Sequence, residues 1–338
     1  MTRARFLRLL AGWALFFLAL PLRAFGETRL RRASGMAPRF TVPENGTPPI
    51  TPVRDFYVED ISGVPDTLKH GAADWTLNIG GQVSHPLALS LSDLQQRKQV
   101  TRVITLSCIG NPVGGHALGT ARWRGVLLSS LLEEAGAAGT AEWLTVHGAD
   151  GYHETLPISE ALQPAALLAT HMNGKILTPD HGWPVRLLIP GLYGIKQVKW
   201  ITRIEAADRW RAGYWHEKGW SREGRVQVFS RIDFPKTDEW LQRGEREIRG
   251  IAFAGDRGID RVEVSWDGGR TWELAELEEA LSPWSWVFWK KRVTFNRSGH
   301  YNLMVRAADQ YSRVQGGNRR DPFPAGTTGY HRVGFRVY

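Results

Sequence analysis

The chain has 338 residues, which at about 150 residues per domain predicts two domains. Hydrophobic residues make up 42% and charged residues 23%, which is ordinary for a protein with a full core and excludes disordered, collagen-like and multi-span membrane proteins for most of the chain. The net charge of +9 contains no block of like charges, so we expect an anionic ligand or partner and no nucleic acid. The single cysteine excludes an intramolecular disulfide and an all-cysteine metal site built by this chain alone.

Residues 1–26 have the pattern of an export signal. Three arginines between residues 3 and 8 precede an uncharged apolar run from Leu9 to Leu20. This run is shorter than the roughly 20 apolar residues of a membrane-spanning helix, so we expect export to the periplasm, with a retained membrane anchor as the alternative. The arginines resemble a twin-arginine signal, Arg-Arg-x-Phe-Leu-Lys, except that Ala4 replaces the second arginine.

The first half of the remaining chain mixes strand and helix patterns. Residues 27–52, with several prolines and glycines, are expected to form an extended linker, and residues 53–207 a domain in which strands are in the majority. A serine and an aspartate at 92–93 predict the start of a short helix, and the leucine spacing of 125–136, closed by a glycine, predicts another. Apolar alternation and β-branched residues predict strands at 75–80, 103–106, 143–146 and 185–190.

The second half reads as strands and turns. Residues 208–235 are aromatic, charged and turn-rich, and are predicted to connect two domains. Residues 236–338 then have an all-β pattern, and many short strands separated by turns predict a β-sandwich of immunoglobulin type. The expected fold class is therefore α+β, a mixed α/β domain followed by an all-β sandwich. The strands of the sandwich are predicted at 248–253, 262–266, 272–274, 287–295 and 301–307, with a tight turn at 267–269.

Cys108 directly follows a predicted strand and opens a glycine-rich loop that ends at Gly115. A loop of this kind holds a side chain in place and gives a ligand close access to the backbone. A thiolate in such a position is a soft metal ligand. On these residues alone, a buried and inert cysteine is the other interpretation.

Several segments along the chain share a pattern with one enzyme family. They are Cys108-Ile-Gly-Asn, Ala121-Arg-Trp-Arg-Gly, Asn173-Gly-Lys and the stretch from Asp180 to Trp200. In this order and spacing they resemble the molybdenum-binding region of the sulfite oxidase family of molybdopterin-dependent oxidoreductases. Residues 265–272 and 306–309 resemble that family's C-terminal immunoglobulin-like domain, which forms a dimer contact. The resemblance extends over residues 53–310.

The resemblance implies a Mo-molybdopterin cofactor with one molybdenum per chain. Cys108 would bind the metal beside the two dithiolene sulfurs of the pterin, and it would be catalytic together with Asp150 and Tyr214, which match positions near the metal and the substrate. The terminal phosphate of the pterin needs arginine and lysine donors. Lys196 is a further basic residue near these positions in the sequence. Taken singly, most of these residues are ordinary turn, core or solvent-exposed positions. The matching cofactor contacts are Tyr57, Cys108, Asp150, His181, Arg186, Gln197, Val198 and Lys199.

Two positions depart from the family's pattern. The family continues its metal cysteine as Ala-Gly-Asn-Arg-Arg, whereas Pro112 and Val113 stand in place of the two arginines. Its Arg-Asn-His segment near the amino end reads Glu59-Asp60-Ile61 here. An acid where a sulfite-binding arginine would lie repels a dianion by about 1 kcal/mol or more in a shielded pocket. The sequence offers Arg122 and Arg124 as substitute charges.

The resemblance implies an exported oxidoreductase that transfers an oxygen atom to or from a small substrate, a sulfite-like sulfur compound by family default. A sulfoxide reductase of the methionine-sulfoxide branch and a cofactor-free binding protein on the same fold are the alternatives. The sequence contains no Cys-x-x-Cys-His haem attachment site. We therefore expect no haem in this chain and a separate electron carrier, a cytochrome or a membrane haem subunit, attracted by the basic charge. A homodimer through the C-terminal domain is also implied.

Overall fold

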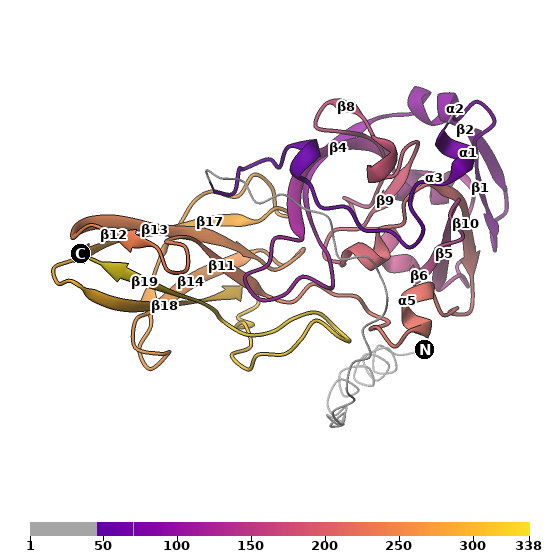
Figure 1. Cartoon of the computed structure of the whole chain (residues 1–338). Coiled ribbons are helices and arrows are strands. Elements are labelled where there is room, and N and C mark those ends of the chain that lie inside the picture. The colour runs from indigo at the N-terminus through magenta and orange to yellow at the C-terminus, as the bar shows by residue number, and fades with distance from the viewer. Residues whose placement is uncertain (1–45, 70) are drawn as a thin grey trace, which may run out of the picture. The chain divides into compact units, whose positions relative to one another are not determined.

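The computed structural model describes residues 46–69 and 71–338. The predicted export signal and most of the predicted linker lie outside the described residues. The described chain forms a first domain that reaches to about residue 217 and an all-β second domain from residue 229 (Figure 1). No helix within the described ranges is long and apolar enough to cross a membrane.

The first domain consists of strands joined by short helices, as predicted. Its longest described helix, α3, has seven residues. The strands are β1 (Thr76–Gly81), β2 (Leu87–Ser90), β3 (Val100–Ser107), β4 (Leu118–Leu127), β5 (Trp143–Gly148), β6 (His153–Pro157), β7 (Leu167–Met172), β8 (Lys175–Ile176), β9 (Arg186–Leu188) and β10 (Ile201–Ala207). The helices are η2 (Val53–Asp55), α1 (Asp66–Lys69), α2 (Leu91–Gln96), α3 (Leu128–Glu134), α4 (Ile158–Ala161), η3 (Pro179–His181), η4 (Gly194–Lys196) and α5 (Tyr214–Glu217).

Two sheets organise these strands. One has the order β2-β1-β10-β5-β6, and the other has the order β3-β4-β7-β8 with β9 paired to β7. β3 and β4 pair along their whole common length, and their inward residues Ile104, Leu106 and Trp123 are at most 1% exposed. This packing fixes the end of β3, from which Cys108 emerges.

The helix predicted over 125–136 begins later than its leucine spacing indicates. Residues 125–127 remain in β4, where they pair with residues 167–169 of β7, so that their backbone groups are satisfied by the sheet. At Gly125 a side chain would collide with the carbonyl oxygen of Leu168, and the strands approach closely there. The helix α3 therefore starts at Leu128.

The predicted start of the other helix is also shifted. Its N-cap is Ser90, not Ser92, because the Ser90 hydroxyl accepts a hydrogen bond from the amide of Asp93. The Asp93 carboxylate accepts in return from the Ser90 amide, which completes a capping box.

The second domain is a two-sheet sandwich, as predicted. One sheet has the order β11-β13-β17-β16 and the other β12-β19-β18-β14-β15. Because β11 pairs with β13, the sandwich begins inside the segment predicted as a connection. Its strands are β11 (Phe229–Phe234), β12 (Trp240–Leu241), β13 (Gly244–Phe253), β14 (Ile259–Ser265), β15 (Glu273–Leu274), β16 (Glu276–Leu277), β17 (Val287–Phe295), β18 (Gly299–Asp309) and β19 (His331–Val337).

The second domain contacts the strand that leads to Cys108. The Thr105 amide donates to the carbonyl of Trp284 at 3.0 Å, and the Trp286 amide donates to the Thr105 hydroxyl at 2.9 Å. Beyond Cys108, the Arg231 guanidinium donates to the carbonyl of Gly115 at 2.8 Å. An apolar cluster that contains Ile109 and Trp286 fills the space between these contacts. The second domain thus supports both sides of Cys108.

Candidate active site

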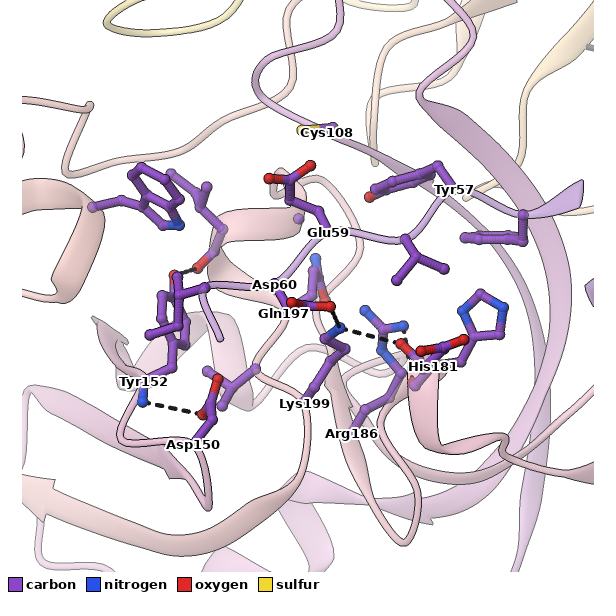
Figure 2. A pocket seen from close by; sticks show the side chains of 18 residues that line it. Tyr57, Glu59, Asp60, Cys108, Asp150, Tyr152, His181, Arg186, Gln197 and Lys199 are labelled. Carbon is purple, nitrogen blue, oxygen red and sulfur yellow. Dashed lines mark hydrogen bonds and ion pairs between the residues drawn. The ribbon is translucent and has the colours of Figure 1, made fainter. Parts of the chain in front are cut away.

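A pocket in the first domain gathers side chains from distant parts of the chain (Figure 2). It encloses about 670 Å³ of space free of protein atoms, part of it open to solvent. The lining comes from residues 56–61, the end of β3, the turn between β5 and β6, residues 180–199 and Trp215. Eight of the predicted site residues line this pocket: Tyr57, Cys108, Asp150, His181, Arg186, Gln197, Val198 and Lys199.

Tyr214 is the predicted site residue that does not line the pocket. Its ring lies 6.1 Å from that of Tyr152 and 5.1 Å from that of Trp215, measured between centroids. Tyr152 and Trp215 both line the pocket, so Tyr214 contacts the residues of the pocket wall and not the pocket itself.

Cys108 provides the sulfur of the pocket. Its amide donates to the carbonyl of Ala117 at 2.9 Å, which closes the loop that follows the strand. The Gly110 amide approaches the sulfur at 3.4 Å. Burial, followed by the charge of Glu59, raises the pKa of the thiol to about 12. A thiol in this environment ionises readily only if a cation such as a metal ion binds it.

Tyr57 lies beside Cys108 on the segment that enters the pocket. Its ring stacks on that of Phe56, and burial and then the neighbouring Cys108 raise the pKa of its hydroxyl. A side chain at Gly194 would come within 2.8 Å of the Tyr57 hydroxyl oxygen. The glycine therefore allows the turn at η4 to approach the tyrosine.

Arg186 is a buried cation with unused hydrogen-bonding capacity. One of its terminal nitrogens donates to the carbonyl of His181 at 3.1 Å, and its guanidinium carbon lies 5.4 Å from the ring centre of Trp123. Its Nε is buried without a hydrogen-bond partner, and no carboxylate within the described ranges forms an ion pair with it. Burial lowers the pKa of the guanidinium to about 10. A buried, unpaired guanidinium favours an anionic ligand.

His181 occupies the same side of the pocket as Arg186. Its Nε2 lies 3.0 Å from the carbonyl oxygen of Val53. Because a carbonyl only accepts, Nε2 carries the hydrogen and Nδ1 is an acceptor. Burial lowers the pKa of the imidazole to about 4, so the ring is neutral at pH 7.

Lys199 adds a second cation. Its Nζ lies 3.3 Å from the Asp60 carboxylate, donates to the carbonyl of Asp180 at 3.1 Å and stands 4.2 Å from the ring centre of Trp200. Burial lowers the pKa of this ammonium to about 8, and Asp60 opposes that shift. Together Lys199 and Arg186 form the basic side of the pocket.

Gln197 and Val198 contribute differently. The Gln197 amide group is fully engaged by backbone, because it accepts from the Ile189 amide at 2.6 Å and donates to the carbonyls of Ile189 and Leu192 at 2.7 and 2.9 Å. Its side chain therefore holds the loop after β9 in place. The backbone of Val198 accepts from the amide of Leu187, which fixes the turn that presents Lys199.

Asp150 lies in the turn between β5 and β6. Its carboxylate accepts from the amide of Tyr152 at 3.1 Å. Burial raises the pKa of this carboxyl, although that hydrogen bond and Lys199 act against the shift. The Tyr152 hydroxyl donates to the carbonyl of Ile195 at 2.5 Å, so that the turn is tied to η4.

Lys196, the other basic residue of this stretch, points elsewhere. Its Nζ lies 2.8 Å from the carboxylate of Glu154, and the two side chains are 2% and 1% exposed. Lys196 does not line the pocket. The expected basic cluster is therefore reduced to Arg186 and Lys199.

Glu59 is the site residue whose significance the sequence revealed only in part. One of its carboxylate oxygens, Oε2, is buried without a hydrogen-bond partner. Burial and then Asp60 raise the pKa of the carboxyl to about 7. Figure 2 shows this carboxyl next to the sulfur of Cys108. The sequence shows an acid at this position, but only the structure shows its carboxyl next to the thiol.

The substitute charges suggested by the sequence are not in the pocket. Arg122 and Arg124 occupy exposed positions of β4, while Trp123 between them points into the core beside Arg186. Pro112 and Val113 belong to the loop that packs against the second domain. In this loop a side chain at Gly114 would collide with His331.

Comparisons with known proteins agree with the architecture. The family profile "Oxidoreductase molybdopterin binding domain" matches residues 62–215, and "Mo-co oxidoreductase dimerisation domain" matches residues 224–333. Sulfite oxidase of Gallus gallus is 30% identical over 340 residues, which cover 84% of this chain and 73% of that protein. A nitrate reductase of Aspergillus niger is also 30% identical, with 86% of this chain and 42% of that protein covered.

The chain therefore belongs to the sulfite oxidase family of molybdopterin-dependent oxidoreductases. It is an enzyme of the molybdenum-dependent class, built from the cofactor-binding and dimerisation domains. It spans about half of human mitochondrial sulfite oxidase, 52%. Among solved structures, the sulfane dehydrogenase SoxCD from Paracoccus pantotrophus has the same fold, with a TM-score of 0.70, 24% identity and 86% of each chain covered.

The pocket fits the cofactor that the family implies. Within the described ranges no three His, Cys, Asp or Glu side chains cluster as a metal site, so a metal at Cys108 needs further ligands from outside the protein. The dithiolene sulfurs of a pterin would supply them. The buried and unpaired Nε of Arg186 calls for an acceptor, which a terminal phosphate provides.

Proposed function

We propose that the protein is an exported molybdopterin-dependent oxidoreductase that transfers an oxygen atom to or from a small sulfur compound. The observation that carries this proposal is the pairing, in one pocket, of a buried thiol at one end with an unpaired buried guanidinium at the other. A soft sulfur ligand and an anion-binding cation are what a metal–pterin phosphate requires at its two ends.

Each proposed contact has a specific task. Cys108 would ligate the metal, and Arg186 and Lys199 would hold the terminal phosphate. His181 would accept a hydrogen bond through Nδ1, and Tyr57 and Asp150 would contact the pterin from the two walls. Gln197 and Val198 would act through the turn that they fix. When bound, the cofactor supplies the two-electron redox change and the oxygen-atom transfer.

The direction of transfer depends on the substrate. Oxidation of a sulfite-like compound takes the oxygen atom from water and releases two electrons and two protons. Reduction of a sulfoxide consumes two electrons and two protons, and the oxygen atom leaves as water. The described pocket offers no cation beside Cys108 to bind an anionic substrate, and this favours sulfoxide reduction as the alternative candidate. In both, we expect a separate periplasmic carrier to exchange the electrons.

Molybdenum content tests the proposal directly. Protein from a host that makes the cofactor is expected to contain about one molybdenum atom per chain, and Cys108→Ser to lose most of it. Met172→Leu is a matched control, because it removes a sulfur from the same apolar cluster as Cys108 without touching the pocket. A metal-free wild-type protein under these conditions would instead support a cofactor-free binding protein.

Export and assembly have separate tests. In this family the cofactor is inserted in the cytoplasm, so a loaded enzyme would cross the membrane folded, by a twin-arginine route. Cell fractionation should find the protein in the cytoplasm when that route is blocked, whereas normal export would identify the general secretory route. Sedimentation equilibrium of the full chain should give a homodimer, and a monomer would contradict it.

A further inference from the structure

The described lining of the pocket contains more acids than cations, and one acid, Glu59, lies beside Cys108 (Figure 2). Of the described pocket residues, four are carboxylic acids, Glu59, Asp60, Asp150 and Asp180, and two are basic side chains, Arg186 and Lys199. The cations lie away from Cys108, and Lys199 is already paired with Asp60 (Figure 2). A bound cofactor phosphate would neutralise the remaining positive charge.

Glu59 dominates the charge around the sulfur. Its carboxyl lies beside the sulfur (Figure 2), and after burial its charge is the cause that raises the pKa of the Cys108 thiol. Its Oε2 is buried and without a partner, so it keeps a hydrogen-bonding position for a ligand. This carboxyl lines the pocket beside the sulfur that would hold the metal (Figure 2).

Among the described residues, Arg186 and Lys199 are the only lysine or arginine side chains that line the pocket. Arg122 and Arg124 are exposed on β4 and do not line the pocket. Arg231 of β11 donates to the backbone of the loop after Cys108, but its guanidinium is paired with Asp233 at 2.6 Å. The substrate end is therefore left with one unpaired acid.

We propose that Glu59 determines the charge of the substrate, excluding sulfur oxyanions and admitting uncharged sulfur oxides. This inference rests on the proposed function and makes it more specific. The physical reason is direct: a dianion placed near a shielded carboxylate is repelled, whereas a neutral sulfoxide is not.

Sulfate binding tests the exclusion without turnover. Isothermal titration calorimetry of the molybdenum-loaded protein with inorganic sulfate compares wild type, Glu59→Gln, Glu59→Arg and the control Glu133→Arg, whose position on α3 is exposed and outside the pocket. We expect Glu59→Arg to bind sulfate at least tenfold more tightly than wild type, Glu59→Gln to lie between them, and the control to match wild type. Equal affinities in wild type and both Glu59 variants would overturn the proposal.

Steady-state kinetics provides the second readout. Wild type is expected to turn over dimethyl sulfoxide and to oxidise sulfite poorly, and Glu59→Arg to shift the ratio of the two kcat/KM values at least tenfold toward sulfite. A wild type that oxidises sulfite efficiently would refute the role of Glu59 while leaving the molybdenum enzyme intact. If Glu59→Arg loads no metal, Glu59→Gln decides the same comparison.

The two proposals fail in different ways. If the proposed function is wrong, the wild-type protein will contain no molybdenum. The role of Glu59 would then be read from sulfate binding in an Arg186→Gln background, which removes the cation of the phosphate position. A Glu59→Arg effect that persists there supports the role of Glu59, and its absence refutes it.

Discussion

Replacing Lys196 by methionine should destabilise the protein without emptying the cofactor site. Lys196 and Glu154 form a buried ion pair with a 2.8 Å separation, and Lys196 also donates to the carbonyl of Thr155 at 3.3 Å. The carboxylate is tightly enclosed, because a side chain at Gly213 would come within 2.7 Å of it. Removing one partner of such a pair leaves an uncompensated charge and costs about 3–5 kcal/mol.

Chemical denaturation would measure this loss, and a double variant would identify its cause. Glu154→Leu combined with Lys196→Met removes both charges, so we expect the double variant to be more stable than Lys196→Met alone. It should still be about 1–3 kcal/mol less stable than wild type, because backbone groups of Thr155 are left unpaired. Molybdenum content should stay near wild type in Lys196→Met and fall in Lys199→Met. A cost below about 1 kcal/mol, as for exposed pairs, would refute the buried-pair reasoning.

Three further predictions concern the pocket and its supports. Arg186→Met should leave the metal-free protein as stable as wild type or more so, since it removes an unpaired buried cation, yet it should lower molybdenum content; a large loss of stability would contradict this. Gln197→Ala should cost about 2–4 kcal/mol in a denaturant titration, because it removes three hydrogen bonds to the backbone, and a neutral change would refute that role. Burial and then Arg231 lower the pKa of His331 to about 4, below its value in the unfolded chain, so acid should favour unfolding. Between about pH 7.5 and 5 the free energy of unfolding of the wild type should fall by about 2 kcal/mol more than that of His331→Gln. An equal dependence on pH in the two proteins would contradict this prediction.

The fold class could be predicted because strand alternation is a local signal. The exception at residues 125–136 is instructive, since the leucine spacing is truly helical but β7 pairs with the first three residues. That partner lies about forty residues further along the chain, and no local pattern reveals it. Strand pairing therefore set the boundary that side-chain spacing could not.

The site was predictable as a set of positions but not as a charge distribution. Lys196 and Lys199 are equivalent in the sequence, yet the turn of η4 sends one to Glu154 in the core and the other to Asp60 in the pocket. Similarly, Arg122 and Arg124 are near in sequence to a pocket-supporting tryptophan but face away from it. Direction of side chains depends on the packed backbone, and that determines which charges a ligand meets.

The contacts between Thr105 and residues 284–286 also bear on biosynthesis. The strand that carries Cys108 obtains these hydrogen bonds from residues translated about 180 positions later, and the loop after it rests on His331 near the carboxyl end. A nascent chain that has produced only the first domain therefore lacks the supports on both sides of its metal-binding cysteine. The cofactor would therefore be inserted only after translation is nearly complete. The second domain would in this way make cofactor insertion, and any export of the folded enzyme, depend on a finished chain.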